Sequence, residues 1–268
     1  RVTPSGTCAQ CDGAAYEDVL REAQELGYAE ADPTNDVGGF DAAYKMAILA
    51  TLGFHAKINF RDVSVKGITG VGIEDIQYAK RLGYEMKLLG IAESKNGHVH
   101  VAVEPTLVSK DHPLAAVSGV FNAIYVYGEA VGETMFYGRG AGEMPTATSV
   151  VADIVAVVKN LKLGTNGRRS QMSYREVESL PADRVYARYF MLLRVEDKAG
   201  VLARITQVFG EHGVSLASVV QQPTVGHSDA EIVIITHQAS KASIDRVLAE
   251  FESIEPVRAV KSVYRVEG

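Results

Sequence analysis

The sequence contains no tryptophan and only two cysteines among its 268 residues. It also lacks a signal peptide and an apolar run of membrane-spanning length, which predicts a cytoplasmic protein without a membrane partner. Basic residues are not in excess, since 27 Lys and Arg stand against 33 Asp and Glu and give a net charge of −6. Phosphate binding depends on clustered Lys and Arg, so we expect no nucleic-acid partner.

The two cysteines form a Cys-x-x-Cys pair, Cys8 and Cys11. Such a pair occurs in redox-active sites and as half of a zinc site. A zinc ribbon needs a second pair, which the sequence lacks. A thioredoxin-like motif needs a strand before the pair and a helix after it, whereas this pair lies among Pro, Ser, Gly and Thr residues. We therefore favour two reduced thiols in an N-terminal loop and expect no metal site.

The chain is long enough for two domains, and its 47% hydrophobic and 22% charged residues are typical of globular proteins. The sequence becomes polar and glycine-containing after Lys162. We predict a first domain at 1–163, a linker at 164–186 and a second domain at 187–268. The chain begins at Arg1 and not at Met, which we interpret as a piece of a longer polypeptide.

Apolar spacing predicts an α+β fold for the first domain, with helices packed on one face of a mostly antiparallel sheet. One helix, at 40–53, is apolar nearly all round, which predicts burial inside the domain. The helices expected are 16–26, 40–53, 73–82 and 146–161, and the strand segments are 63–71, 85–93, 98–108 and 122–137.

The second domain shows the order βαββαβ, which is a ferredoxin-like unit. Ser240 is suited to cap the second helix of this unit. The expected strands are 189–196, 214–221, 232–236 and 257–266, and the expected helices are 201–211 and 240–251.

A short acidic stretch carries the first candidate site, with Glu30, Asp32, Asp36 and Asp41 followed by Lys45. Acids near a helix start favour the helix dipole, and an isolated lysine usually keeps its amine in water. On pattern alone, helix capping is favoured. Asp41 and Lys45 nevertheless share a helix face because they are one turn apart. A carboxylate and an amine placed so can hold a small zwitterion and move its proton.

The second candidate, in the segment 136–147, has alternate glycines at Gly138, Gly140 and Gly142 before a helix that begins near Thr146. Glycine lets the backbone approach a ligand closely, and a helix N-terminus suits anions. The spacing differs from the dinucleotide fingerprint, and a tight strand-to-helix turn also explains it.

The third candidate is the connection Asp197-x-x-Gly200-Val201-Leu202 between a strand and a helix. Gly200 permits a tight turn. Polar side chains and free amides in this turn could bind a small amino acid, and a plain turn is the alternative.

Residues from about 15 to 161 resemble the catalytic and dimerisation region of homoserine dehydrogenase, and residues 188–266 resemble an ACT domain, a regulatory module that binds amino acids. The first resemblance is carried by Leu26-Gly27-Tyr28-Ala29-Glu30-Ala31-Asp32-Pro33, Asp41-Ala42-Ala43-Tyr44-Lys45, Leu82-Gly83-Tyr84, Lys87-Leu88-Leu89-Gly90-Ile91-Ala92 and Phe136-Tyr137-Gly138-x-Gly140-Ala141-Gly142-x-x-Pro145-Thr146-Ala147.

The resemblance implies reduction of aspartate 4-semialdehyde to homoserine with NADP or NAD, on the way to threonine, isoleucine and methionine. It implies that Lys45 moves the proton at the reacting oxygen and that Asp41 orients Lys45. The implied substrate-binding residues are Gly27, Tyr28, Glu30 and Asp36. The implied cofactor contacts are Gly138, Gly140, Ala141, Gly142 and Thr146. The implied effector contacts are Asp197, Ala199, Gly200, Val201 and Leu202.

The family's N-terminal Rossmann domain, with its glycine-rich first turn, is missing from this sequence. We therefore expect this chain alone to bind nicotinamide cofactor poorly and to be inactive. Ala199 stands where the ACT motif usually has Pro, a change that should leave the fold intact. By family analogy we expect threonine as the effector and a homodimer or homotetramer. The alternative hypothesis is a non-catalytic module for oligomerisation and amino-acid sensing.

Overall fold

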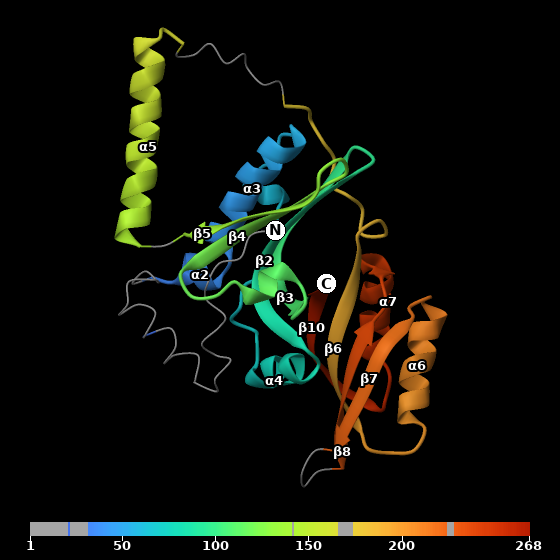
Figure 1. Cartoon of the computed structure of the whole chain (residues 1–268). Helices are drawn as coiled ribbons and strands as arrows, with labels where there is room; N and C mark the ends of the chain where they lie inside the picture. Colours follow the sequence, from blue (N-terminus) through green and yellow to red (C-terminus); the bar gives the residue numbers. More distant parts are fainter. Residues whose placement is uncertain (1–20, 22–31, 141, 166–173, 224–227) are drawn as a thin grey trace. The chain divides into compact units, whose positions relative to one another are not determined.

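Figure 1 shows the computed structural model of the chain, which describes residues 21, 32–140, 142–165, 174–223 and 228–268. The chain divides into two compact units. Unit 1 comprises residues 1–69, 88–103 and 116–179, and unit 2 comprises residues 70–87, 104–115 and 180–268. The pair Cys8–Cys11 and, apart from helical Arg21, the predicted helix 16–26 lie outside the described residues. The predicted domain boundaries stay a prediction.

In unit 1, helix α3 (Phe40–Phe54) confirms the predicted helix at 40–53. It follows Gly39, whose φ of +79° lies in the left-handed region that favours glycine. The inner face of α3 is made of small or flexible side chains, which lets the helix approach strand β2 (Tyr84–Lys95) closely. A Cβ atom added to Gly90 of β2 would lie 2.3 Å from Met46 Cγ. The buried residues of α3 are Ala42, Ala43, Met46, Ala47 and Ala50.

The outer face of α3 corrects the prediction that this helix is buried all round. Phe40, Tyr44, Ile48 and Leu52, spaced four residues apart, are exposed. Residues with this spacing form one stripe along a helix. The helix is therefore apolar on both faces, but within the described part of the chain only the alanine-rich face is buried.

Strands β2 (Tyr84–Lys95) and β3 (His98–Ser109) pair with each other and each runs from one unit into the other. They confirm the predicted strands at 85–93 and 98–108. Asn96 and Gly97 join them with positive φ at both residues, as a two-residue hairpin turn requires.

The predicted strand at 63–71 is wrong for most of its length. Only β1 (Ser64–Val65) forms there, after the short 3-10 helix η3 (Phe60–Asp62), and it pairs in parallel with β3. The chain then turns away from the sheet, because Gly67 fits against the backbone of Val37 and Gly38, and Ile68 N donates to Val37 O at 2.9 Å.

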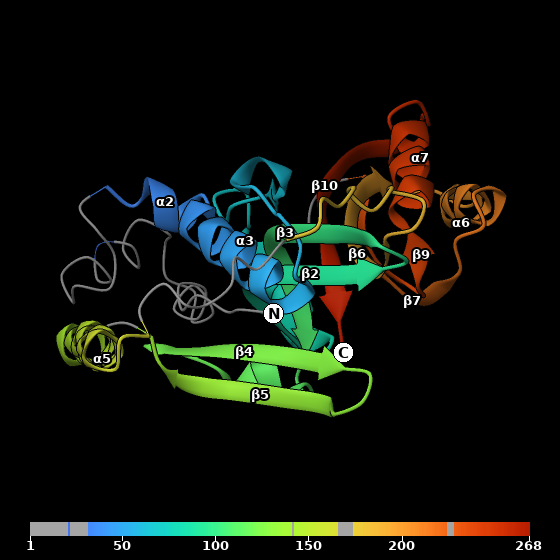
Figure 2. The same ribbon diagram turned by 90° about the horizontal axis from the view of Figure 1, so that it is seen from above.

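The predicted strand segment at 122–137 forms two strands. β4 (Phe121–Gly128) and β5 (Gly132–Arg139) make an antiparallel hairpin, which Figure 2 shows as a separate ribbon of two strands. The five-residue segment from Gly128 to Gly132 contains the reversal, and Gly132 has a φ of +72°. Two glycines thus divide a continuous apolar pattern into a hairpin.

Helix α5 (Glu143–Lys162) extends the predicted helix at 146–161 but has no buried residue. The expectation that it covers the sheet is therefore wrong within the described chain. By length and composition alone, α5 is also the one described helix that could cross a membrane, which corrects our expectation that no segment reaches that length. Such a helix is weak evidence for a membrane span, because subunit interfaces use the same composition.

Unit 2 has the predicted ferredoxin-like order, which completes the expected α+β class. The strands of this ferredoxin-like part lie in the order β10-β6-β8-β7 with antiparallel neighbours, and the end of β3, which belongs to unit 2, pairs in parallel with β10. Short β9 (Ala239–Ser240), which was not predicted, pairs with the start of β6. The other elements are β6 (Tyr186–Glu196), α6 (Val201–Glu211), β7 (Leu216–Pro223), β8 (Asp229–Thr236), α7 (Lys241–Phe251) and β10 (Val257–Glu267).

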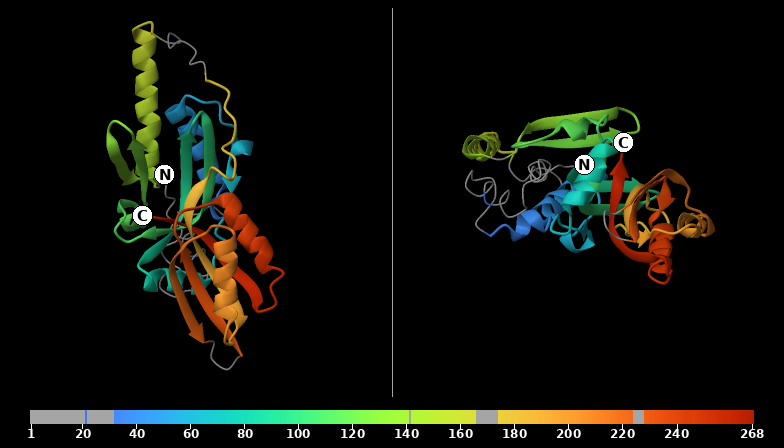
Figure 3. Two further views of the ribbon diagram at one scale, coloured as in Figure 1. Left: turned by 90° about the vertical axis from the view of Figure 1, so that its right-hand side faces the viewer. Right: turned by 90° about the horizontal axis from the view of Figure 1, so that it is seen from below.

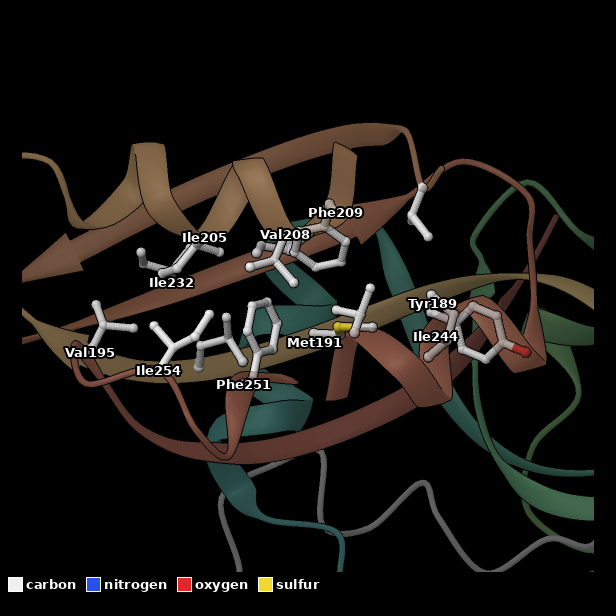
Figure 4. Packing of buried hydrophobic residues seen from close by; sticks show 14 of the residues in the cluster. Tyr189, Met191, Val195, Ile205, Val208, Phe209, Ile232, Ile244, Phe251 and Ile254 are labelled. Atoms are coloured by element: carbon white, nitrogen blue, oxygen red, sulfur yellow. The ribbon is translucent and has the colours of Figure 1, made fainter. Parts of the chain in front are cut away.

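Helices α6 and α7 cover one face of this sheet (Figure 3) and close the core of unit 2. In Figure 4, Ile205 and Phe209 of α6 and Phe251 of α7 point toward Met191 and Ile232 on the strands. The rings of Phe209 and Phe251 meet edge to face with centroids 5.4 Å apart. This geometry is the favoured one for buried aromatic pairs.

The opposite face of the same sheet carries α4 (Ile73–Arg81), which confirms the predicted helix at 73–82. Side chains alternate along a strand, so Glu231 and Tyr264 point away from the core residues Ile232 and Val263 beside them. Both contact α4, which lies across the strands from α6 in Figure 1. The sheet of unit 2 is thus covered on both faces. Unit 2 also contains the 3-10 helix η4 (Pro113–Ala116).

Candidate functional site

The best-defined part of the candidate active site is an ion pair on α3. Lys45 Nζ lies 2.6 Å from Asp41 Oδ2, one helical turn away. The Lys45 side chain is 55% exposed and that of Asp41 is 45% exposed. The structure therefore brings together the two residues expected to handle the proton, at the surface of α3, where a substrate can reach them.

Aromatic residues of the same helix form a cluster with η3, and the sequence analysis missed it. Tyr44 stacks on Phe60 of η3 with ring centroids 4.3 Å apart, and Phe40 approaches the same ring at 6.4 Å. Tyr44 and Phe40 directly adjoin Lys45 and Asp41 in the sequence, but neighbouring residues of a helix do not share a face. The aromatic cluster thus joins η3 to α3 along the stripe next to the one that carries the ion pair. The four-residue spacing of the α3 aromatics was the signal available in the sequence.

The acidic loop before α3 is only partly described. Asp32 caps the following turn: its Oδ1 accepts from Thr34 Oγ1 at 2.6 Å and from Thr34 N at 3.1 Å. These hydrogen bonds, the side-chain one first, lower the pKa of Asp32. Asp36 is exposed in the short helix α2 (Thr34–Val37). Gly27, Tyr28 and Glu30 lie outside the described residues.

The glycine turn between β5 and α5 has two different surroundings. At Gly138 an added Cβ atom would meet open space, so the backbone there is free to contact a ligand. At Gly140 it would lie 1.3 Å from the side-chain nitrogen of Asn122, so the side chain of Asn122 occupies that place. Gly140 N is also held by Val120 O at 3.1 Å. Position 140 therefore requires glycine, because the Asn122 side chain leaves no room for a Cβ atom.

The end of this turn begins helix α5. Gly142 has a φ of +119°, a conformation reserved for glycine. Thr146 Oγ1 donates to Gly142 O at 2.9 Å, which fixes the first turn of the helix. Ala141 lies outside the described residues. Within the part of the chain that the structure describes, no hydrogen bond or ion pair joins this turn to Asp41 or Lys45.

Asn122 is a candidate contact residue that the sequence analysis overlooked. It lies opposite Gly138 in the β4–β5 hairpin, and Phe121 lies opposite Arg139. The Arg139 guanidinium lies 5.5 Å from the centre of the Phe121 ring, which also stacks on Tyr137 at 4.9 Å. The Asn122 amide, the Arg139 guanidinium and the open backbone of Gly138 therefore lie together at one end of the hairpin. Only the strand register reveals this grouping.

The candidate effector turn joins β6 to α6. Asp197 N donates to Ser228 O at 2.8 Å, and Gln221 Nε2 donates to Asp197 Oδ1 at 3.4 Å. Gly200 has a φ of +91° and caps α6. Asp197, Ala199 and Gly200 are exposed, and Leu202 is 36% exposed. The side chain of Val201 is buried in the core, so only its backbone is available to a ligand at this turn.

The sequence model of the homoserine dehydrogenase family matches residues 7–155, more than half of the chain, and that of the ACT domain matches residues 189–256. The chain belongs to the homoserine dehydrogenase family. The two matches cover the Asp41–Lys45 pair and the Asp197–Leu202 turn, respectively, as the resemblance implied.

Similar homoserine dehydrogenases are found among characterised proteins and solved structures. That of Bacillus subtilis is 54% identical over 94% of this chain and 59% of its own length. That of Synechocystis is 42% identical over 95% of this chain and 61% of its own. The crystal structure of a homoserine dehydrogenase from Thiobacillus denitrificans superposes with a TM-score of 0.88 at 37% identity, over 96% of this chain and 60% of that one.

The chain spans about 60% of the length of these homoserine dehydrogenases. The structure of the Staphylococcus aureus enzyme gives the same result, with 100% of this chain and 64% of that one covered at a TM-score of 0.72 and 34% identity. The described residues therefore correspond to the larger part of each homoserine dehydrogenase and not to the whole.

Proposed function

We propose that the native protein containing this chain is a homoserine dehydrogenase that interconverts aspartate 4-semialdehyde and homoserine. The observation that carries this proposal is the 2.6 Å pair of Lys45 and Asp41 on a helix within the family match. Hydride transfer to an aldehyde leaves an alkoxide that needs a proton donor within hydrogen-bond reach. An ammonium group held by a carboxylate one turn earlier meets this need.

In this mechanism Lys45 gives its proton to the developing alkoxide during reduction and removes it during oxidation. Asp41 keeps the lysine amine in place and balances its charge. Asp36 and Glu30 are proposed to hold the ammonium and hydroxyl groups of the substrate, with Gly27 and Tyr28 beside them. The exposed position of the pair lets the substrate enter and the proton exchange with water.

The proposed cofactor is NADP or NAD, which supplies the hydride when bound. The described residues fit only one end of such a molecule. The open backbone at Gly138 and the amide of Asn122 offer a contact surface. Ala141, Gly142 and Thr146, at and just before the start of α5, are proposed to extend it. Gly140 is proposed to act through the Asn122 side chain that fills its place. These residues would hold the nicotinamide near the substrate.

We propose amino-acid regulation, by threonine in the first instance, at Asp197, Ala199, Gly200, Val201 and Leu202. The ACT match covers this turn, and its exposed backbone offers donors to a carboxylate. The proposed role is a step toward threonine, methionine and isoleucine, placed in the cytoplasm. Regulation by an end product is consistent with that role.

The proposed assembly is a homodimer or homotetramer. Its support is the exposed apolar surface of unit 1, where large apolar residues gather on α5 and on the outer face of α3. A surface of this kind is typical of an interface with another protein chain or a membrane, and we favour the first. A second copy is the proposed occupant, because like surfaces pair in symmetric dimers.

The test of the catalytic role is Lys45→Ala in the complete native enzyme. We expect kcat for homoserine oxidation to fall by about 10²–10⁴-fold, the usual contribution of a positioned acid or base. The free energy of unfolding should change by less than about 0.5 kcal/mol, because the lost ion pair is exposed. Lys57→Ala is the matched control, since Lys57 is an exposed lysine of unit 1 that pairs with Glu176 at 3.1 Å.

Near-normal turnover in Lys45→Ala would rule out the proton-transfer role. A native enzyme that turns over no homoserine with either cofactor, yet binds amino acids, would support the non-catalytic sensing module instead. Titration of this chain alone with NADP and NAD then tests the expected weak cofactor binding.

A further inference from the structure

Helix α4 belongs by sequence to the dehydrogenase region but is held by side chains of the ferredoxin-like unit. Its residues, Ile73–Arg81, lie inside the family match at 7–155. Its polar partners lie on β7, β8 and β10. Ile76 and Ala79 of α4 are buried at 2% and 0% exposure. The helix thus joins two parts of the sequence that the family comparison separates.

Asp75 is the buried centre of this contact, with 5% exposure. Its Oδ1 accepts from Ser262 Oγ at 2.5 Å, and its Oδ2 accepts from Tyr264 Oη at 2.7 Å and from Gly72 N at 3.0 Å. Burial first, and then the bond to Asp75, raises the pKa of Tyr264, so this hydroxyl remains a donor. A buried carboxylate tolerates the loss of such donors poorly.

A second group of side chains surrounds this centre. Lys261 Nζ bridges Glu231, at 2.8 Å, and Glu74 of α4. Tyr78 Oη donates to the same Glu231 at 2.6 Å. Glu74 and Tyr78 are one turn apart on α4. A shift of the helix along the sheet must therefore break several bonds together, which favours discrete arrangements over gradual movement.

The effector turn is bonded to the same strands. Asp197 N is held by Ser228 O, directly before β8, and the Asp197 side chain accepts from Gln221 of β7. The next residue of β7, Gln222, lies opposite Glu231 of β8 in the strand register. A ligand that moves Asp197 therefore acts on β7 and β8 within a few residues of the contacts with α4.

Helix α4 contacts these same two strand residues, Gln222 and Glu231. Arg81 Nη1 donates to Gln222 Oε1 at 3.2 Å, and Tyr78 binds Glu231. At this same C-terminal end, α4 continues through Gly83 into β2, which runs into unit 1. There the backbone of Gly90 lies against Met46 of α3, the helix that carries Asp41 and Lys45.

We infer that α4 is the coupling element through which an amino acid bound at the Asp197–Leu202 turn changes the activity of the Asp41–Lys45 pair. This inference rests on the proposed function and adds the route of its regulation. Tyr264 and Tyr78 are positioning residues, because they contact α4 and the sheet but neither substrate nor effector. Coupling requires that the effector favour one arrangement of α4 on the sheet over another.

The experiment uses Tyr264→Phe and Tyr78→Phe, singly and together, in the complete native enzyme. Each removes one hydroxyl and keeps the ring. Tyr186→Phe is the matched control, because Tyr186 lies on β6 with 49% exposure. Threonine is the first probe, followed by the other proteinogenic amino acids. Calorimetry measures effector binding, and steady-state kinetics measure kcat and KM with and without saturating effector.

We expect the double variant to bind the effector within about threefold of the wild type and to keep its basal kcat and KM within about twofold. The factor by which the effector changes kcat/KM should fall to less than about twofold, from the 5–150-fold typical of allosteric coupling. Tyr78→Phe alone, at the half-buried rim, should lose part of this factor. This single variant still tests the inference if loss of the Tyr264 hydroxyl prevents folding.

An unchanged response in variants that bind the effector overturns the inference and leaves the proposed regulation standing. Loss of effector binding together with the response also overturns it, because the two tyrosines then support the effector site itself. If the wild type neither binds nor responds to any amino acid, the proposed regulation fails and the inference fails with it. The control Tyr186→Phe must respond as the wild type does.

Discussion

Unit 2 and unit 1 differ in how completely their apolar surfaces are covered. In unit 2 the sheet is covered on one face by α6 and α7 and on the other by α4. In unit 1, α5 has no buried residue and the outer stripe of α3 is exposed. The difference teaches that the ferredoxin-like unit folds around its own core, whereas the dehydrogenase unit presents surfaces suited to a partner.

The largest expected effect compares one residue type at a covered and an uncovered position. Ile205 of α6 is 0% exposed and Ile48 of α3 is 61% exposed. Ile205→Ala should lower the free energy of unfolding by about 2–5 kcal/mol, because it leaves a cavity. Ile48→Ala in the monomeric chain should change it by less than about 0.5 kcal/mol. Urea unfolding followed by circular dichroism measures both, and equal losses would break the comparison.

The next effect tests whether a second copy covers α5. Val151 and Ile154 lie on one face of the helix and are 57% and 56% exposed. Val151→Asp/Ile154→Asp should weaken self-association at least about a hundredfold, since each charge would be buried without a partner. Analytical ultracentrifugation of the native protein measures this. Ser149→Asp, on the opposite side of the same helix, is the control, and an unchanged assembly in the double variant would remove α5 from the interface.

A smaller effect concerns how the helices begin. Ser240 Oγ accepts from Ser243 N at 3.1 Å and caps α7, whereas α3 and α5 follow glycines without a side-chain cap. Ser240→Ala should destabilise unit 2 by about 1 kcal/mol. Ser149→Ala in exposed α5 should have almost no effect. Thermal unfolding of the two variants compares them, and a Ser149→Ala loss as large as that of Ser240→Ala would contradict the distinction.

The smallest expected effect is a pH dependence confined to unit 2. Burial first, and then the bond to Glu231, raises the pKa of half-buried Tyr78 to about 12. The unfolded chain loses this proton near pH 10, so above that pH the unfolded state binds fewer protons and stability falls. This contribution is complete below about pH 10 and is lost as the pH rises toward about 12. Tyr78→Phe should flatten the decline, and an identical profile for the variant would refute this role.

The elements of unit 2 could be predicted from the sequence because their signals are local. Alternating apolar residues, Gly200 before α6 and Ser240 before α7 set each boundary within a few residues. The strand predicted at 63–71 failed because Gly67 and Gly70 interrupt the apolar pattern and the chain turns there. The burial of α5 could not be predicted, since burial depends on what packs against a helix and not on its own composition.

In the candidate site, too, the features with a local signal were predictable and those that depend on distant segments were not. The pairing of Lys45 with Asp41 was predictable, because a spacing of four residues within one helix fixes their proximity. The Asn122 side chain in the place of a Gly140 Cβ depends on the β4–β5 register, which no single segment reveals. The contact of Asp75 with Ser262 joins residues 187 positions apart. Neither end of that contact carries a sequence signal for the other.

The buried Asp75 carboxylate has a consequence for any engineered removal of the ferredoxin-like part of unit 2. A cut anywhere between 164 and 186 would delete Ser262 and Tyr264 while retaining Asp75. The truncated product would keep only the Gly72 N bond to this carboxylate and would expose the apolar side of Ile76, a combination that favours aggregation. Conservative replacement of the two tyrosines is therefore a sounder design than excision of residues after the cut.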